Sequence, residues 1–416
     1  MDPVIIVGAG LAGLSCARAL KRRQIPFLII EASDRLGGKL KTDVIRGFHL
    51  DRGFQVYFTA YPTAKNQLDE NKLDFKRFDA GAVVIWDGTQ QMISRDKPLQ
   101  TALSSLIGMS DKLRLGRWTS DLGWLDQEDI QASHDTTSEQ LLKDEGFSDD
   151  FIERFARPFL GGVFADRSLT TSSRQLQFVW KALGEGETVI PELGMEEIPK
   201  QIGATFGPDL LWTNIKVVEL LRMGSQVIGV KLDNGQELKA SHVVLATDVQ
   251  EAANLSGLAI DLEFRHSISI YFTAPTAPID GPTLVLNGNM RGITNSIAPI
   301  SAVKGHTSGE ALICATILGE RPESDEQLAE IVKSEMLLWF PDKDTDSWSF
   351  LKAYRCPNAQ LAQPPHIWDK MPRQDSGIDG LIFAGEYTTN SSIDGAIRSG
   401  LEAADLILEN RSASVA

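Results

Sequence analysis

The first 31 residues constrain the fold of this chain more than any other segment. The apolar run Val4–Val7 ends in a Gly-x-Gly-x-x-Gly pattern that passes directly into a helical pattern. A second apolar run, Phe27–Ile30, follows a charged turn and ends at Glu31. A strand, a helix and a second strand in this arrangement predict a βαβ unit that binds a dinucleotide.

The three glycines of the pattern serve different purposes. Gly8 permits a tight turn, Gly10 lets the backbone approach a pyrophosphate, and Gly13 lets the helix pack closely on the strand. Free N–H groups at the start of the helix favour a negatively charged ligand, and we expect Glu31 to accept hydrogen bonds from a ribose. A glycine-rich structural turn in another kind of α/β domain is the alternative. The binding residues predicted here are Gly8, Gly10, Leu11, Ala12, Gly13, Glu31 and Ala32.

Charge and composition exclude several classes of function. The chain has 41 Lys and Arg against 56 Asp and Glu, a net charge of −15, which argues against nucleic acid as a partner. No apolar run reaches the roughly 18 residues that a membrane-spanning helix needs. The cysteines and histidines are scattered, so we expect a reducing compartment and no metal site. Because the first strand begins at Val4, we also expect no signal or transit peptide and a cytoplasmic location.

Residues 98–182 have a mostly helical pattern. Apolar side chains recur there at roughly helical spacing, namely Leu99, Leu103, Leu106, Ile107, Leu113, Leu115, Trp118, Leu122 and Leu125. A pair of helices facing the core is the favoured interpretation. The alternative is a surface that dips into a membrane or admits an apolar substrate, which leaves a peripheral membrane contact open.

Turn residues and periodicity predict further elements. A helical pattern begins at Tyr61, and Asp87-Gly88 marks a hairpin between two strands. Residues 151–165 have the pattern of a helix that is broken at Pro158 and at the glycine pair behind it. Strands are also predicted at 268–272, 283–286 and 311–317, and helices at 324–339 and 395–408.

Three further blocks follow the opening one along the chain. The second block is an Arg-x-Gly-Gly segment that begins at Arg35 and ends at Thr42. The third is residues 214–218, and the fourth comprises residues 383–388 and 393–396. In this order, and together with the opening glycines, they resemble the flavin amine oxidoreductase superfamily, which includes amine oxidases, protoporphyrinogen oxidases and carotenoid desaturases. The resemblance covers nearly the full length of the chain.

The resemblance implies that these blocks hold FAD without a covalent bond. In the family, the glycine pair and the basic residue corresponding to Lys39 lie along the pyrophosphate and ribityl chain. The residue matching Val217 contacts the adenine, and the one matching Glu386 binds ribityl or pyrophosphate oxygens. The helix that follows Ile393 is implied to point at the flavin, where its dipole stabilises negative charge. Outside the first block, the residues implied to bind FAD are Arg35, Gly37, Gly38, Lys39, Gly53, Phe54, Gln55, Val217, Gly385, Glu386, Ile393 and Ala396.

Contacts gathered from the start, middle and end of the chain suit an extended, nearly buried FAD better than NAD, which usually binds locally. We therefore expect an α/β fold with two domains. One is a Rossmann-like FAD-binding domain of the glutathione-reductase type, discontinuous over residues 1–60, 186–255 and 350–416. The other is an α+β substrate domain made of residues 61–185 and 256–349.

The chain departs from the amine oxidases of the superfamily at three points. The strand at residues 265–272 lacks their lysine, Ser392 stands where they tend to have an aromatic residue, and Cys356 lacks the context of their flavin-anchoring cysteine. Residues 157–165 and 191–195 instead resemble segments of protoporphyrinogen oxidases and carotene desaturases, although a leucine replaces one glycine of the second segment.

These features favour an FAD-dependent desaturase or dehydrogenase. It would pass a hydride from a C–H bond of an apolar, isoprenoid or tetrapyrrole-like substrate to flavin N5, with O₂ or a quinone as electron acceptor. A soluble amine oxidase that releases hydrogen peroxide is the alternative, and a partner-binding protein with a structural FAD is the third hypothesis. No catalytic residue is predicted. The side chains considered as lining the flavin face are Gln55, Tyr57, Tyr271, Arg291 and Tyr354.

Overall fold

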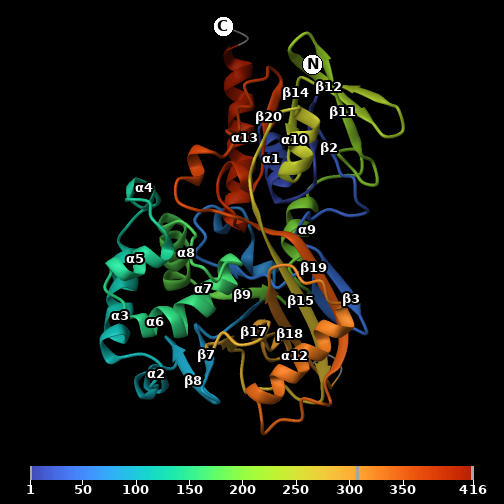
Figure 1. Ribbon diagram of the computed structural model, residues 1–416. Helices are drawn as coiled ribbons and strands as arrows, with labels where there is room; N and C mark the ends of the chain where they lie inside the picture. Colours follow the sequence, from blue (N-terminus) through green and yellow to red (C-terminus); the bar gives the residue numbers. More distant parts are fainter. Residues whose placement is uncertain (1, 306–308, 414–416) are drawn as a thin grey trace.

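The computed structural model describes residues 2–305 and 309–413, and two large sheets form its frame (Figure 1). The sheet nearer the chain termini has the strand order β10-β2-β1-β14-β20, with every neighbouring pair parallel. Its strands are β1 Val4–Val7, β2 Phe27–Ile30, β10 Leu211–Trp212, β14 His242–Leu245 and β20 Leu381–Phe383. They therefore come from the beginning, the middle and the end of the chain.

Both faces of this parallel sheet are covered, which is why its strands have continuous apolar sequences. Ile6 and Val244 face a core that includes α1 (Leu11–Arg22) and α13 (Ile393–Ala413). The neighbouring Ile5 belongs to the core on the other face, because successive strand residues point to opposite sides. That second face is covered by α10 Val249–Ser256 and by a meander of β11 Val217–Met223, β12 Gln226–Leu232 and β13 Glu237–Lys239.

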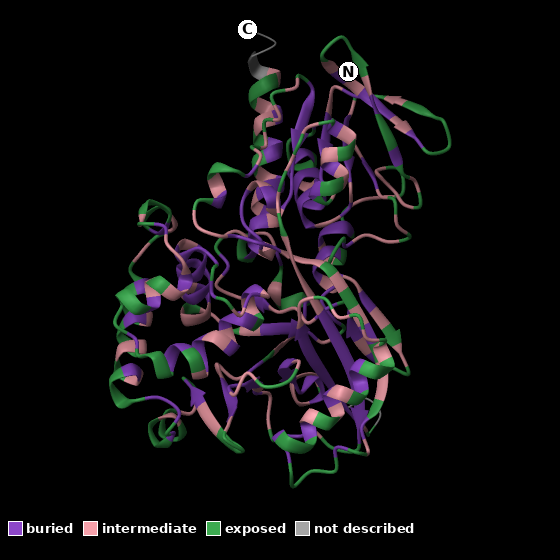
Figure 2. Ribbon diagram, in the orientation of Figure 1, coloured by how far each residue is buried: buried purple, intermediate pink, exposed green. Residues whose placement is uncertain are grey.

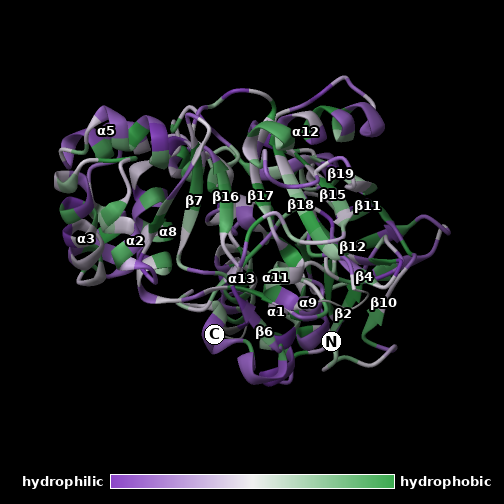
Figure 3. Ribbon diagram, turned by 90° about the horizontal axis from the view of Figure 1, so that it is seen from below, coloured by the Kyte–Doolittle hydropathy of each residue, from purple (hydrophilic) through white to green (hydrophobic). Residues whose placement is uncertain are grey.

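The second large sheet has seven strands in the order β19-β15-β18-β17-β16-β7-β8. All neighbours are antiparallel except β16 and β7. The helix α12 (Asp325–Trp339), which Ser324 caps, packs on one face through Val332 and Met336. Figure 3 shows the hydrophobic colour of β7, β16 and β18. The strands are β7 Gly81–Trp86, β8 Thr89–Ser94, β15 Phe264–Ala274, β16 Leu284–Asn287, β17 Thr294–Ala298, β18 Ala311–Leu318 and β19 Ser349–Leu361.

The mostly helical pattern predicted for residues 98–182 is confirmed. Aromatic side chains join these helices, as where Trp118 of α3 and Trp180 of α8 lie with ring centres 5.2 Å apart. The helices are α2 Pro98–Leu103, α3 Met109–Gly123, α4 Gln127–Ala132, α5 Ser138–Asp144, α6 Asp149–Phe151, α7 Arg157–Phe164 and α8 Ser173–Glu185. They form a layer on the left of Figure 1, beside the edge of the seven-stranded sheet that β8 occupies.

Smaller elements connect these layers. Two are small sheets: the hairpin of β3 Thr42–Ile45 and β4 Phe48–Asp51, and the three-stranded sheet of β5 Tyr57–Phe58, β6 Phe75–Arg77 and β9 Thr188–Pro191. The short helices are α9 Glu197–Gly203 and α11 Ile300–Lys304. The 3-10 turns are η1 Ala64–Asn66, η2 Glu70–Lys72, η4 Ile367–Asp369 and η5 Glu386–Thr388. The predicted division into two domains stays a prediction. Its boundary at residue 350 falls inside β19, which pairs with β15 in the seven-stranded sheet.

The hypothesis of a core-facing helix pair over residues 99–125 is wrong for part of the apolar pattern. Trp118 and Leu122 are buried as expected. Leu99, Leu103 and Leu113, by contrast, are more than two-thirds exposed at 72%, 78% and 71%. The helices are short and pack through one face only, so the apolar residues of the other face remain outside. Figure 2 shows α2 coloured as mostly exposed.

The predicted break at Pro158 is also wrong. Residues 149–164 are helical without interruption, because Ala156 before α7 is itself helical, and Pro158 and the glycine pair both lie inside this run. The irregular part comes before, as a π-helical turn over Ile152–Ala156. The helical pattern from Tyr61 likewise gives only 3-10 turns, because the N–H groups at the start of η1 donate to Asp394 instead of continuing an α-helix.

The hairpin predicted at Asp87-Gly88 is confirmed, with φ of +46° and +72° at these residues, between β7 and β8. In the described part of the chain, no helix is long and apolar enough to cross a membrane.

The contact between α1 and α13 gives a test of the fold. A Cβ at Gly400 would lie 2.1 Å from the Ala12 carbonyl oxygen, whereas one at Gly116 of α3 would meet nothing within 4 Å. We therefore expect Gly400→Ala to lower the free energy of unfolding by about 1–3 kcal/mol through overpacking. Gly116→Ala should raise it by about 0.5–1 kcal/mol, because alanine favours a helix. Urea unfolding of the FAD-loaded protein measures both, and equal effects would contradict the close packing.

Candidate active site

One cavity of about 1600 Å³ extends from the carboxyl edge of the parallel sheet to the helical layer. Ligands of open parallel sheets bind at that edge, and the volume exceeds the roughly 300–1000 Å³ of common ligand sites. The structure brings most of the predicted binding residues together there. The predicted residues that line the cavity are Gly8, Gly10, Leu11, Ala12, Glu31, Ala32, Gly37, Gly38, Lys39, Gly53, Phe54, Gln55, Val217, Gly385, Glu386, Ile393 and Ala396.

The turn between β1 and α1 leaves room for a ligand because its glycines have no side chains. Gly8 has a φ of +107°, and a Cβ there would lie 2.6 Å from the Ala246 carbonyl oxygen. A Cβ at Gly38 would lie 3.1 Å from the Gly10 Cα. Gly10 precedes α1, and in the described residues no side chain caps this helix. Its first N–H groups are therefore available to an anion such as a pyrophosphate.

Glu31 ends β2 beside this turn. Its Oε2 accepts a hydrogen bond from the Ala9 N–H at 2.7 Å, and its Oε1 accepts one from the Ser33 N–H at 2.9 Å. Oε1 also accepts a hydrogen bond from the Ser33 hydroxyl at 2.6 Å. Three bonds thus fix the carboxylate at the cavity wall, and Oε2 keeps a lone-pair site for a further donor, since two oxygens offer about four such sites. The arrangement suits the hydroxyl groups of a ribose.

Two predicted residues, Gly13 and Arg35, do not line the cavity. A Cβ at Gly13 would lie 2.0 Å from the Gly8 carbonyl oxygen, so this glycine serves the close packing of α1. Arg35 forms ion pairs with Asp43 at 2.7 Å and with the buried Glu196 at 3.1 Å. Its guanidinium thus fixes the start of the loop whose glycine pair reaches the cavity.

Asp43 is the centre of this ion-pair network. Arg52 donates to its Oδ2 at 2.8 Å, and the Tyr354 hydroxyl donates to the same oxygen at 2.8 Å. The hydrogen bond from Arg52, with those from Arg35 and Tyr354, outweighs burial and holds the pKa of this carboxyl well below its usual range. Because Tyr354 belongs to β19, the network joins the loop to the seven-stranded sheet.

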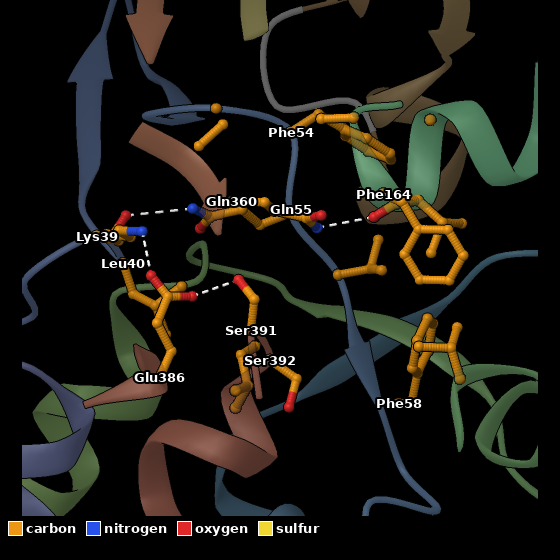
Figure 4. Close-up of a pocket in the computed structure, with 18 of the residues that line it drawn as sticks. Lys39, Leu40, Phe54, Gln55, Phe58, Phe164, Gln360, Glu386, Ser391 and Ser392 are labelled. Carbon is orange, nitrogen blue, oxygen red and sulfur yellow. Dashed lines mark hydrogen bonds and ion pairs between the residues drawn. The ribbon is translucent and has the colours of Figure 1, made fainter. Parts of the chain in front are cut away.

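Polar contacts cross the middle of the cavity (Figure 4). Lys39 forms an ion pair with Glu386, to which the Ser391 hydroxyl donates at 2.5 Å. The amide of Gln55 donates to the Lys39 carbonyl oxygen at 3.2 Å, while its Oε1 is buried and has no partner among the described residues. A buried acceptor without a donor in a cavity wall is a feature that a bound polar ligand would satisfy.

An aromatic wall encloses the part of the cavity towards the helical layer. Phe155 and Phe159 stack with ring centres 5.6 Å apart, and Trp180 stands edge-on to Phe159 at 6.0 Å. Phe58 and Phe164 line the same cavity. This aromatic surface is suited to a bulky apolar substrate.

Four of the five side chains considered for the flavin face do not line the cavity, so that prediction is wrong for them. Tyr57 and Tyr271 are buried, with their hydroxyl groups donating to Glu70 and to the Asp51 carbonyl oxygen. Tyr354 donates to Asp43, and Arg291 is exposed. Gln55 alone of the five lines the cavity.

Sequence reasoning missed several residues of the cavity wall. The resemblance at residues 157–165 is the signal that could have found Phe159 and Phe164. Gln360 donates to the Val163 carbonyl oxygen at 2.7 Å and lines the cavity near the end of β19. No motif marks Gln360, because its place depends on the pairing of β19 with a strand almost 100 residues earlier.

The sequence and fold can now be compared with known proteins. Residues 11–408 match the model of the flavin containing amine oxidoreductase family. The chain belongs to this family. The enzyme is therefore an FAD-dependent oxidoreductase that binds its FAD non-covalently. The uncapped α1, the glycine cradle and the unpartnered Gln55 oxygen fit such a cofactor.

The individual proteins that this flavin amine oxidoreductase resembles have low sequence identity to it. The chloroplastic protoporphyrinogen oxidase of Nicotiana tabacum is 26% identical over 190 residues, which cover 45% of this chain and 33% of that protein. The coproporphyrinogen III oxidase of Mycobacterium bovis is 25% identical over 211 residues, 48% of this chain and 45% of that protein. The chain thus matches less than half the length of either relative. A structure of putrescine oxidase bound to putrescine shares the fold, with a TM-score of 0.72 at 18% identity and coverage of 98% and 99%.

Removal of the Glu31 carboxylate should weaken FAD binding. We expect Glu31→Ala to raise the Kd for FAD by about 10- to 100-fold, because hydrogen bonds to a charged group contribute about 1.5–3 kcal/mol. Fluorescence titration of the apoprotein with FAD measures this change. Glu237→Ala, at an exposed position of β13, is the control. Thermal unfolding of the apoprotein separates a lost ligand contact from a damaged fold, and an unchanged Kd would contradict the assignment.

The Asp43 network should make stability depend on acid pH. Its folded-state pKa lies below the unfolded value of about 3.9, so its contribution is complete above that pH and is lost as the pH falls. At pH 7 we expect Asp43→Asn to lower the free energy of unfolding by about 1 kcal/mol. The difference from wild type should shrink as the pH falls below about 4. Urea unfolding across this range is the measurement, Asp261→Asn is the exposed control, and a pH-independent difference would refute the mechanism.

Proposed function

We propose that this enzyme removes a hydride from a C–H bond of a bulky apolar substrate, of the tetrapyrrole or isoprenoid kind. The observation that carries the proposal is the aromatic wall of Phe155, Phe159 and Trp180 in the same cavity as the predicted FAD-binding residues. When bound, FAD supplies the acceptor for the hydride. O₂ or a quinone is the proposed final electron acceptor.

In this proposal the FAD occupies a Rossmann-like domain of the glutathione-reductase type. Its diphosphate lies at the start of α1, its adenine ribose at Glu31, and its ribityl chain beside Glu386. The discontinuity of the domain is supported by the parallel sheet, whose strands come from three distant parts of the chain. The cytoplasmic location remains a prediction.

The chain's own residues bind and orient the substrate and exclude water. Two carboxylates of the cavity wall are held in ion pairs: Asp79 bonds to Lys97 at 2.7 Å, and Glu187 to Arg77 at 3.1 Å. A carboxylate held by a cation is a weaker acceptor for a proton. Hydride removal from a substrate that stabilises its own cation needs no side-chain acid or base, so this surface suits the proposed reaction.

The residues of the seven-stranded sheet that line the cavity argue against the alternative of an amine oxidase. Among the described residues, twelve from the seven-stranded sheet beyond its β7–β8 edge line the cavity, and none is a lysine. They are Phe264, Ser267, Leu284, Leu286, Ser296, Thr316, Leu318, Cys356, Pro357, Asn358, Ala359 and Gln360. A lysine on this kind of strand is typical of the amine oxidases. Ser392 lines the cavity where those enzymes tend to have an aromatic residue.

A porphyrinogen is the substrate that we favour over an isoprenoid. Arg95 and Lys112 line the cavity beside the helical layer, where they could meet the carboxylates of a tetrapyrrole. The curated relatives from Nicotiana tabacum and Mycobacterium bovis carry the names of porphyrinogen oxidases.

Anaerobic titration tests the proposal. The purified holoenzyme is mixed with a porphyrinogen, an isoprenoid polyene precursor and a panel of amines, and the visible flavin absorbance is followed. We expect the porphyrinogen to bleach the flavin and to lose two electrons, as one hydride and one proton, for each flavin reduced. Bleaching by an amine, with hydrogen peroxide released in air, would overturn the proposal in favour of an amine oxidase. Bleaching by the isoprenoid alone would keep the reaction and change the substrate.

A further inference from the structure

Two neighbouring helices carry apolar side chains on the outside of the molecule. Leu99 and Leu103 lie one turn apart on α2 and share a face, as do Met109 and Leu113 on α3. Trp124, which ends α3, lies about three turns after Leu113 on the same side and is 86% exposed. All five are exposed. We call these five residues the α2–α3 patch; Figure 2 shows the exposure of α2.

The patch borders an opening of the cavity. Met109 and Leu113 line the cavity and are also exposed, and the same holds for Ala102 and Gly116. The ammonium of Lys112 donates to the Ala102 carbonyl oxygen at 3.1 Å, which ties α3 to α2 beside this opening. An apolar path therefore leads from the patch to the aromatic wall.

The patch differs in charge from the rest of the protein. The chain has a net charge of −15, yet residues 95–124 hold five basic and three acidic side chains. Arg117 is 84% exposed beside the patch, and Arg95 is about half exposed. The acidic groups that face these residues are Asp121, 3.4 Å from Arg117, and Asp96, 3.9 Å from Arg95.

We propose that the α2–α3 patch docks on an anionic lipid surface. Leucine and tryptophan beside arginine and lysine is the composition of helices that lie in a membrane interface. The rest of the molecule carries the excess of negative charge, so an anionic surface repels it. Other exposed apolar residues, such as Met223 and Leu338, stand apart from the cavity and are ordinary.

Docking there would let an apolar substrate pass from the lipid into the cavity without crossing water. This delivery role rests on the proposed function, but the docking itself does not. The test therefore contains no substrate, so its failure and the failure of the proposed reaction can be told apart.

Co-sedimentation with vesicles tests the docking. The FAD-loaded full chain is spun with vesicles of phosphatidylcholine, alone or with phosphatidylglycerol. We expect anionic vesicles to bind it about fivefold more tightly for each basic residue that reaches the surface, and about 1 M salt to release it. The variant Leu99→Glu/Leu103→Glu should lose at least about tenfold in vesicle binding, because two leucines no longer enter the lipid. Neither of these leucines lines the cavity.

The control Leu337→Glu/Leu338→Glu places the same charge on α12, away from the patch, and should bind vesicles as the wild type does. Retained flavin absorbance shows that each variant is folded. The proposal is overturned if the wild type does not sediment, if it binds neutral vesicles equally well, or if the control loses as much binding. It is also overturned if gel filtration shows a wild-type dimer that Leu99→Glu/Leu103→Glu dissociates, since the patch would then contact a second copy.

Discussion

The close approach of three backbone segments at the carboxyl edge of the parallel sheet is the constraint on which the site depends. The turn after β1, the loop after β2 and the segment after β20 meet there. Side chains at Gly8, Gly10 or Gly38 would fill the space between them or collide with neighbouring backbone. Because these positions have no Cβ, the start of α1 stays open, and its N–H groups and dipole are free for a diphosphate.

Ion pairs and buried hydrogen bonds hold these loops against the second sheet. Asp43 joins the Arg35 loop to Tyr354 of β19. Asp394, at the start of α13, accepts hydrogen bonds from the N–H groups of Thr63 and Ala64 at 2.7 and 2.8 Å. These contacts connect the parallel sheet with the elements that lead to the seven-stranded sheet. These polar contacts, together with the hydrophobic core that Ile6, Trp118 and Tyr271 share, hold the carboxyl edge of the parallel sheet in place relative to the aromatic wall.

The aromatic wall and the α2–α3 patch are two ends of one apolar path. Helices that pack through a single face bury Trp118 and Leu122 and leave Leu103 and Leu113 outside. Exposed apolar side chains gathered beside the opening of a cavity commonly mark a site of interaction. The same helical layer thus forms the wall of the cavity and its entrance, which relates the choice of substrate to the surface from which it arrives.

The sequence by itself determined the βαβ unit, the family and many residues of the cavity at the carboxyl edge of the parallel sheet, because glycine positions and apolar runs act through local backbone geometry. Only the tertiary structure decided what depends on packing between distant segments. It shows that Arg35 lies outside the cavity, that Gln360 lines it and that Leu99 is exposed. Periodicity shows that a helix has an apolar face, but it does not show whether another element covers that face. Among the residues that the structure describes, none covers the exposed side of α2 and of half of α3, because these helices lie at the edge of the molecule.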